Sequence, residues 1–298
     1  MSRVALPADW VTRVSAYPAD GGPTGAEWVA TVPRRLDDAL DRWGLVADGD
    51  PRTGWTAVVV PVVRDGEQLV LKVTWPHPEG EHEALALRTW GGSGAVRLVA
   101  ALPSDGVLLL ERLDADTDLR DVWVDEACEV VGGLLGRLQV AAPPQIARMS
   151  EYLTPHLERM AGRAAVPRRI VSRTQGLARE LLTGEVPERL LHTDLHFENV
   201  LRGPGGWTAI DPKPVAGHPG FDLFPLLHNR VGELGTGAAF RWSVRHRVSL
   251  AAEAAGIDLD EAFAWTLLRA GIEVSWVSAT GSADELSLHV ALTKALDE

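Results

Sequence analysis

The chain has 298 residues, of which 46% are hydrophobic and 23% charged, as in a globular protein large enough for one large domain or two lobes. Its 41 acidic and 29 basic residues give a net charge of −12, and no Lys/Arg cluster occurs, so nucleic-acid binding is disfavoured and a cationic substrate is favoured. No apolar run approaches the ~18 residues of a membrane span, the N-terminus lacks a signal-peptide core, and the single Cys128 cannot form an internal disulfide, so we expect a cytoplasmic protein.

Two helices followed by an antiparallel meander are predicted for the first 75 residues. The predicted elements are helices at 6–16 and 25–42 and strands at 43–46, 57–63 and 68–75. The second helix places apolar residues at four-residue steps, and the strands are β-branched runs separated by turn-forming segments. The first turn contains Gly49 and Gly54 but no G-x-G-x-x-G motif, so a plain hairpin turn is favoured over a phosphate-binding loop.

The last of these strands carries an unusual lysine. Only three of the 29 basic residues are lysines, namely Lys72, Lys213 and Lys294, so arginine is used wherever any positive charge suffices. A lysine inside a strand therefore predicts a specific role for Lys72. The segment 78–90 that follows is predicted to be helical, and it would place Glu79 and Glu83 on one face at an i, i+4 step.

Two more strands and a long helical region complete the predicted secondary structure. The strands span 95–102 and 106–111, and the second turns polar at its end, where a hinge between lobes would lie. From residue 116 onward the pattern is almost entirely helical. Helices are predicted near 125–140, 147–164 and 168–183, with three more within 236–297, a region rich in tryptophan and acidic residues.

The segment 190–213 contains the residues that point most clearly to chemistry. It reads as a polar loop followed by a β-hairpin, with His192-x-Asp194-x-x-x-x-Asn199 in the loop and Asp211 at the exit of the second strand. Phosphoryl transfer from ATP needs a carboxylate that orients the acceptor hydroxyl and oxygen ligands for magnesium. These residue types and their spacing are typical of a kinase catalytic loop. His192 and His196 are expected to brace this loop rather than to transfer protons.

These motifs carry a family resemblance. His-Thr-Asp-Leu-His-Phe-Glu-Asn-Val-Leu at 192–201, followed by Ala-Ile-Asp-Pro-Lys at 209–213, resembles the aminoglycoside phosphotransferase family, and within it the streptomycin and hydroxyurea phosphotransferase branch. The resemblance implies an α+β, bilobal, protein-kinase-like fold. Its N-terminal lobe, residues 1–113, would hold a small antiparallel sheet, and its C-terminal lobe, residues 114–298, would be mainly helical.

The resemblance also implies roles for the residues of the reaction itself. Asp194 would orient the acceptor hydroxyl and take its proton, while Asn199 and Asp211 would bind Mg²⁺. Lys72 would hold the phosphates of ATP, the co-substrate, and Glu83 would position Lys72, with Glu79 as the alternative.

Further residues are expected to support this machinery. Backbone groups near Glu111 to Leu113 would bind the adenine ring. Asp222 would cap a helix and fix the catalytic loop from behind. His218 stands where the family more often has Asp, and the helices of 236–297 would wall the acceptor site.

The expected function is therefore ATP- and Mg²⁺-dependent phosphorylation of a hydroxyl on a small polar, cationic molecule. A streptomycin-type aminoglycoside is the first candidate, as in antibiotic resistance, and hydroxyurea or an endogenous metabolite such as an amino sugar are the alternatives. A catalytically idle nucleotide-binding protein would not need the complete residue set, and the loops of a protein kinase are missing. The expected partners are a nucleotide and a small-molecule acceptor, with no nucleic acid, membrane or protein partner implied.

Overall fold

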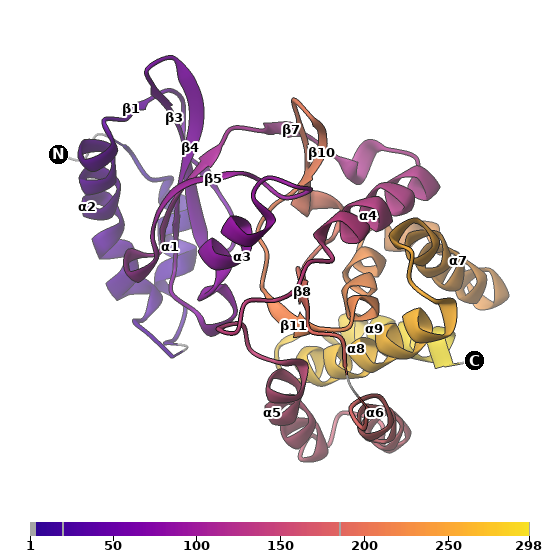
Figure 1. Ribbon diagram of the computed structural model, residues 1–298. Helices are drawn as coiled ribbons and strands as arrows, with labels where there is room; N and C mark the ends of the chain where they lie inside the picture. Colours follow the sequence, from indigo (N-terminus) through magenta and orange to yellow (C-terminus); the bar gives the residue numbers. More distant parts are fainter. Residues whose placement is uncertain (1–3, 20, 185, 298) are drawn as a thin grey trace. The chain divides into compact units, whose positions relative to one another are not determined.

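A computed structural model describes residues 4–19, 21–184 and 186–297. The chain divides into two compact units, the first ending at Asp114 and the second beginning at Ala115 (Figure 1). The first unit is a sheet with helices and the second is mainly helical, so the predicted α+β organisation is confirmed. Each unit is built around its own apolar core.

The first unit is organised around one antiparallel sheet. Its elements are α1 (Ala8–Ser15), α2 (Gly25–Trp43), β1 (Val46–Ala47), β2 (Arg52–Thr53), β3 (Ala57–Arg64), β4 (Glu67–Thr74), a 3-10 turn (Pro78–Gly80), α3 (Glu83–Trp90), β5 (Leu98–Leu102) and β6 (Val107–Glu111). The strand order is β1-β3-β4-β6-β5, and β2 also pairs with β3. The predicted meander is therefore present, although β2 forms within the segment that was expected to be a turn.

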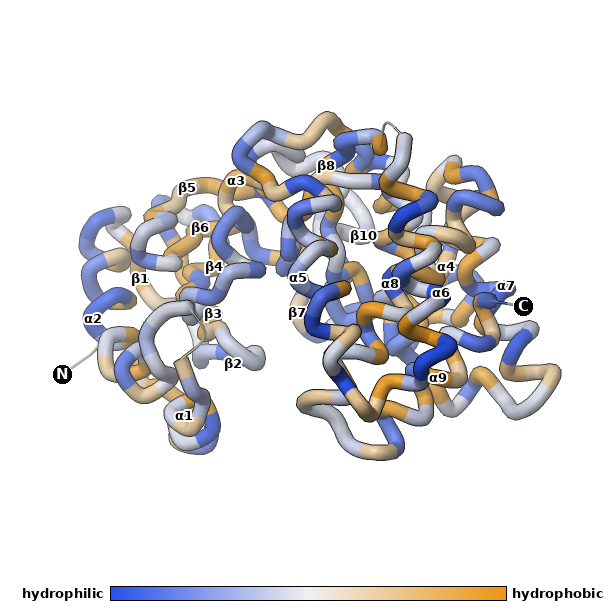
Figure 2. The backbone as a smooth tube through the Cα atoms, turned by 90° about the horizontal axis from the view of Figure 1, so that it is seen from below, coloured by the Kyte–Doolittle hydropathy of each residue, from blue (hydrophilic) through white to orange (hydrophobic). Residues whose placement is uncertain are grey.

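Helices α1 and α2 cover one face of this sheet. The ring of Trp10 on α1 meets that of Trp28 on α2 edge to face at 5.6 Å. Both rings belong to a core cluster with alternate residues of the central strands, including Val60, Leu71 and Leu109. Burial of each aliphatic side chain contributes about 1.5–3 kcal/mol. Figure 2 shows the result as hydrophobic orange segments on β4 and β6 and hydrophilic blue segments on the outer side of α2.

The opposite face of the sheet receives α3. Side chains alternate along a strand, so Lys72 on β4 points away from the face that holds Leu71 and Val73 in the core cluster. The predicted helix 78–90 is interrupted: Glu79 lies in the separate 3-10 turn, and α3 begins only at Glu83. The expectation that Glu79 and Glu83 share one helical face is therefore wrong.

The second unit contains six helices of eight residues or more among the residues described. Its main elements are β7 (Asp114–Asp118), α4 (Val124–Leu138), α5 (Met149–Ala161), α6 (Arg168–Leu181), β8 (Arg189–Leu191), β9 (Val200–Gly203), β10 (Gly206–Ala209), β11 (Val215–Gly217), α7 (Gly237–Ala255), α8 (Leu259–Thr280) and α9 (Ala283–Asp297). Short 3-10 turns lie at Leu119–Asp121, Phe197–Asn199, Pro219–Leu223, Pro225–His228 and Val231–Glu233. The three C-terminal helices match the prediction. The region predicted to be helical from residue 116 onward begins instead with strand β7.

Close helix packing fixes the core of this unit. A methyl group added at Gly132 of α4 would lie 2.3 Å from the carbonyl oxygen of Ala251 on α7, so the two backbones nearly touch. Cys128, on the same helix, is completely buried. Among the residues described, none of the helices is both long and apolar enough to cross a lipid bilayer.

Two small sheets carry the loop that contains Asp194. Strands β9 and β10 form the predicted hairpin, which β7 extends to a three-stranded sheet. Strands β8 and β11 pair antiparallel, with Leu191 opposite Val215. The loop 192–199 begins directly after β8 and ends directly before β9, so both of its ends are held by sheet hydrogen bonds.

Candidate active site

Lys72 and Glu83 form a buried ion pair within the first unit. The ammonium nitrogen of Lys72 lies 2.6 Å from a carboxylate oxygen of Glu83, and the two side chains are only 5% and 8% exposed. Strand β4 supplies the lysine and the first turn of α3 supplies the glutamate. Breaking such a buried pair typically costs about 3–5 kcal/mol, because one charge is left buried without its partner. Lys72, predicted to hold the phosphates, and Glu83, predicted to position it, are therefore brought together.

Within the second unit, strand pairing aligns the predicted catalytic loop with the segment after the hairpin. The pairing of β8 with β11 continues beyond both strands, since the amide of Lys213 donates to the carbonyl of His192 at 2.9 Å. The hydroxyl of Thr193 donates to the carbonyl of Lys213. Residues 192–194 and 211–213 are thus tied together side by side, although they are distant in sequence.

Asp222 holds this loop from behind. Its carboxylate accepts hydrogen bonds from the backbone amides of His192 at 2.9 Å and of Thr193 at 2.6 Å. Thr193 has a φ of 56°, a left-handed conformation that is strained for a β-branched residue. The two hydrogen bonds stabilise this backbone, so the expected bracing role of Asp222 is confirmed. Asp222 does not cap a helix, because the 3-10 turn at Pro219–Leu223 is capped by the side chain of His218 instead.

His192 is a structural residue of the loop, as predicted. Its ring is fully buried, with Nε2 2.9 Å from the carbonyl oxygen of Ile210, and its Nδ1 accepts a hydrogen bond from the amide of Asp194. A carbonyl oxygen only accepts, so the proton is on Nε2 and the ring is neutral. Burial lowers the pKa of His192 to about 4, and the nearby negative charges of Asp194 and Asp211 offset this only in part. His192 therefore carries no charge at neutral pH and fixes the backbone.

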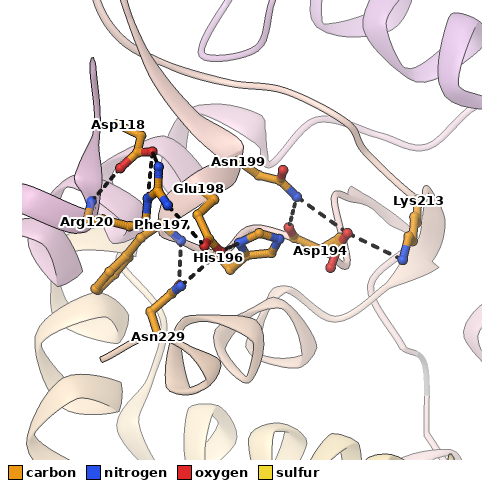
Figure 3. A network of polar contacts seen from close by, with 9 residues as sticks. All are labelled: Asp118, Arg120, Asp194, His196, Phe197, Glu198, Asn199, Lys213 and Asn229. Atoms are coloured by element: carbon orange, nitrogen blue, oxygen red, sulfur yellow. Dashed lines mark hydrogen bonds and ion pairs between the residues drawn. The ribbon is translucent and has the colours of Figure 1, made fainter. Parts of the chain in front are cut away.

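Asp194 lies between an amide and an ammonium group (Figure 3). The side-chain nitrogen of Asn199 donates to the carbonyl oxygen of Asp194 at 2.8 Å and lies 3.4 Å from its carboxylate. On the other side, the ammonium nitrogen of Lys213 lies 3.4 Å from the same carboxylate oxygen. The side chain of Asp194 is 26% exposed, so its carboxylate can still reach a bound molecule.

The oxygen atoms of Asn199 and Asp211 fit the ligand preference of magnesium. The amide nitrogen of Asn199 is directed at Asp194, and Figure 3 shows its side-chain oxygen pointing the other way, where it can bind a cation. The amide of Ile210 donates to the carbonyl of Asn199 at 2.9 Å, which places Asp211 one residue beyond this contact. Carboxylate and carboxamide oxygens are ligands that Mg²⁺ prefers.

Further polar contacts fix the loop at its far end. The amide of Phe197 donates to the side-chain oxygen of Asn229 at 2.7 Å, and the side-chain nitrogen of Asn229 donates to Glu198 at 3.2 Å. His196 lies 3.1 Å from the same carboxylate, and Arg120 lies 3.8 Å from its other oxygen. The bracing role of His196 stays a prediction, because its buried Nδ1 has no hydrogen-bond partner among the residues described.

Lys213 is the functional candidate that motif spacing did not assign. It directly follows Asp-Pro, two residues after Asp211, and its charge is directed at Asp194. A signal was present in the composition, since Lys213 is one of only three lysines in a chain that otherwise uses arginine. Lys213 lies outside any strand, so scarcity alone does not separate it from Lys294; its contact with Asp194 does.

The segment predicted to bind adenine lies at the end of β6. The amide of Glu111 donates to the carbonyl of Arg97, and the side chain of Glu111 accepts from the amide of Arg97 at 2.8 Å. The side chain of Glu111 is therefore engaged within the first unit, and Leu113 is partly exposed two residues later. A nucleotide contact here would have to use backbone groups, and this assignment stays a prediction.

Most acidic and aromatic residues of the C-terminal helices have structural roles. Asp258 caps α8, and Glu285 forms a capping pair with Ser282 before α9. The ring of Trp265 stacks on His218 at 5.2 Å. His218 in turn accepts from the amide of Gly220 and contacts Glu261 at 3.2 Å, so it fulfils the capping role of an aspartate at this position.

A family model described as "Aminoglycoside/hydroxyurea antibiotic resistance kinase" matches residues 42–281. The chain belongs to this kinase family. The resemblance identified from the loop 192–201 and the segment 209–213 is therefore confirmed, and this antibiotic resistance kinase family member is a small-molecule phosphotransferase of the aminoglycoside type.

Individual relatives of known name align with nearly the whole chain. Streptomycin 6-kinase of Streptomyces glaucescens is 38% identical, covering 95% of this chain and 94% of that protein. Hydroxyurea phosphotransferase of Kitasatospora aureofaciens is 40% identical, covering 98% and 86%. Among solved structures, a thermostable mutant of aminoglycoside phosphotransferase APH(4)-Ia, in ternary complex with ADP and hygromycin B, has a TM-score of 0.58 at 14% identity, covering 89% of this chain and 97% of that chain. This likeness confirms the predicted kinase-like fold.

Proposed function

We propose that this kinase uses ATP and Mg²⁺ to phosphorylate a hydroxyl group of a small cationic molecule, with a streptomycin-type aminoglycoside as the first candidate. The observation that carries the proposal is the arrangement of Asn199 and Lys213 on either side of the partly exposed carboxylate of Asp194. The name of the 38% identical streptomycin kinase supports the substrate class, as does the net charge of −12. The name of the 40% identical relative keeps hydroxyurea as the alternative, and an amino sugar is a third candidate.

In the proposed reaction, Asp194 accepts a hydrogen bond from the acceptor hydroxyl and takes its proton late, because the transition state is loose and needs little base strength. Lys213 keeps a positive charge next to this carboxylate and is available to the phosphoryl group as negative charge moves. Asp222 and His192 hold the loop so that the Asp194 carboxylate keeps its direction. Covalent chemistry by the protein lowers the activation free energy of phosphoryl transfer only slightly. Positioning of the reactants and charge stabilisation lower it most.

Several of the predicted residues would hold the nucleotide. Lys72 binds the α- and β-phosphates, and Glu83 keeps the lysine extended from the strand. Magnesium, when bound to Asn199 and Asp211, supplies positive charge that neutralises the phosphates. Backbone groups near Glu111 and Leu113 hold the adenine ring. The ADP in the ternary complex of APH(4)-Ia, a protein of the same fold, supports the choice of an adenine nucleotide.

The test is an ADP-release assay with ATP and Mg²⁺ across streptomycin, hydroxyurea and an amino sugar. We expect streptomycin to raise the rate above the water-only background. In the same assay, Asp194→Asn should lower the acceptor-dependent rate by about 10²–10⁴-fold, while ADP binding measured by calorimetry stays within a few-fold of wild type. Acceptor-dependent turnover that survives in Asp194→Asn would rule out the role of Asp194, and turnover with hydroxyurea alone would replace the substrate.

A further inference from the structure

Two histidines and a glutamate meet in the second unit, and none of them takes part in the phosphoryl transfer proposed above. His228 ends the 3-10 turn Pro225–His228, Glu273 lies on α8 and His289 lies on α9. One ring nitrogen of each histidine and one carboxylate oxygen lie within 4.8 Å of one another. Because three separate elements supply these groups, their convergence depends on the tertiary fold and not on local sequence.

The ring of His289 is oriented in the manner of a metal ligand. The Nδ1 atom lies 2.9 Å from the carbonyl oxygen of Glu285, one turn earlier on α9. A carbonyl oxygen only accepts, so Nδ1 carries the proton and Nε2 keeps a lone pair. Metal-binding histidines are commonly fixed by such a hydrogen bond from their other nitrogen. His289 is only 8% exposed, so this orientation is held by packing as well.

Glu273 is also held in place by a neighbouring residue. A guanidinium nitrogen of Arg269 lies 2.7 Å from Oε1 of Glu273. Arg269 also donates a hydrogen bond to the hydroxyl oxygen of Tyr152 at 2.9 Å. The guanidinium also lies over the rings of Phe221 and Trp276. Oε2 is thus the oxygen that Glu273 can offer to a further partner. Ligating carboxylates are typically hydrogen-bonded in this way by an outer residue.

We propose that His228, Glu273 and His289 bind a divalent transition-metal ion of the Zn²⁺ class. Two imidazole nitrogens and one carboxylate oxygen suit Zn²⁺ or Co²⁺, whereas Mg²⁺ prefers oxygen ligands alone. Three protein ligands leave a fourth position for water or another ligand. His228 is an exposed residue, so solvent reaches the cluster at this ligand.

The geometry requires one adjustment. Ligand atoms about 2.1 Å from a tetrahedral ion lie roughly 3.4 Å apart, so groups up to 4.8 Å apart must move closer. His228 is the ligand expected to move, because it is an exposed residue; its ring meets Phe224 edge to face at 5.1 Å and lies tilted to the ring of His289 at 5.4 Å. Positive charges on Arg269 and Lys213 act on His228, so the affinity will be lower than in a site without cations nearby.

The experiment is a Co²⁺ titration of the full-length, chelator-treated protein, followed by visible absorption. We expect one Co²⁺ per chain with tetrahedral d–d bands, displaced by one equivalent of Zn²⁺ and unaffected by excess Mg²⁺. His228→Ala, at an exposed position that should not disturb folding, and Glu273→Gln should each weaken Co²⁺ binding by at least about 10-fold. Thermal unfolding and circular dichroism verify that each variant is folded.

The matched control is His246→Ala, which removes a histidine of the same unit that stacks on Trp242 outside this cluster. This variant should keep wild-type Co²⁺ stoichiometry and spectrum. The proposal is overturned if the wild-type protein gives no tetrahedral spectrum. It is equally overturned if His228→Ala and Glu273→Gln, both folded, bind Co²⁺ as well as His246→Ala does. Because the readout is metal binding, a failure here is distinct from a failure of the ADP-release assay.

Discussion

Lys213 is the residue whose charge most directly affects Asp194. The ammonium nitrogen lies 3.4 Å from the carboxylate, and the backbone of Lys213 is fixed by hydrogen bonds to His192 and Thr193. A long lysine side chain is normally free to move. Here the backbone of Lys213, from which the side chain extends, is held by the same strand pairing that holds the loop. In the proposed reaction, this charge would lie beside Asp194 as negative charge develops on the phosphoryl group.

Lys213→Met, which keeps the length of the side chain but removes its charge, should lower kcat/KM for the acceptor by about 10²-fold. Lys213→Arg should recover part of this loss, because the charge returns with a different shape. The measurement is steady-state ADP release, with Lys294→Met as control, since Lys294 is exposed on α9. Equal rates for Lys213→Met and Lys294→Met would show that the charge next to Asp194 is dispensable.

At the scale of elements, the contact between α4 and α7 is set by two adjacent glycines with opposite surroundings. A methyl group at Gly132 would meet the Ala251 carbonyl at 2.3 Å, whereas one at Gly133 would meet nothing within 4 Å. A backbone carbonyl cannot turn aside as a side chain can. Substitution at Gly132 therefore tests the close packing of the two helices, whereas substitution at Gly133 tests only the effect of glycine on helix stability.

Gly132→Ala should lower the free energy of unfolding by about 1–3 kcal/mol, because α4 and α7 must move apart. Gly133→Ala should raise it by about 0.4–1 kcal/mol, because the unfolded chain loses freedom and no contact is disturbed. Urea unfolding followed by circular dichroism measures both values. If the two substitutions have the same sign, the close approach of the helices is not what keeps glycine at 132.

The long periodic elements and the site residues of the loop could be predicted from sequence. The stripe of Trp28, Val32 and Leu36 places α2, and β-branched runs place β3 and β4. Strand β11, and the acidic β7, could not be predicted, because each is defined by a partner far away in the chain. The position of Lys213 beside Asp194 depends on that same long-range pairing. Motif spacing could therefore name Asp194 and Asn199 but not their cationic neighbour.

At the scale of the whole molecule, the second unit carries several histidines whose pKa is lowered by burial, and His156 and His192 are two of them. Nδ1 of His156 contacts Arg159 and accepts a hydrogen bond from Trp276, and burial together with nearby arginine charge lowers its pKa to about 4. Burial lowers the pKa of His192 to a similar value. Burial raises the pKa of Asp222 to about 6, which acts in the opposite direction.

These shifts predict that the second unit loses stability in acid. The folded-state pKa of each histidine is depressed. Its contribution to the free energy of unfolding is therefore complete above pH 6.5 and is lost as the pH falls towards 4. The pKa of Asp222 is raised in the folded state, so its protonation adds to the free energy of unfolding as the pH falls from 6 to about 4. The pKa values of His218 and His228 are lowered as well, so these histidines outnumber Asp222 and the free energy of unfolding falls as the pH falls; its slope against pH reports this difference in bound protons.

Hydrogen exchange at pH 6.5, 5.5 and 4.5 measures this slope for amides of α5 and β8. His192→Gln should make the slope shallower by about one proton, because glutamine does not titrate. A slope that is unchanged in this variant would mean that other groups govern the acid response.

The burial of Cys128 has a practical consequence for the two units. Its environment raises the pKa of the thiol to about 12, so maleimide reagents will leave the native chain unlabelled. Only cysteines introduced on the surface then take up a dye. One such position before Asp114 and one after Ala115 would let energy transfer in single molecules test whether nucleotide changes the distance between the units.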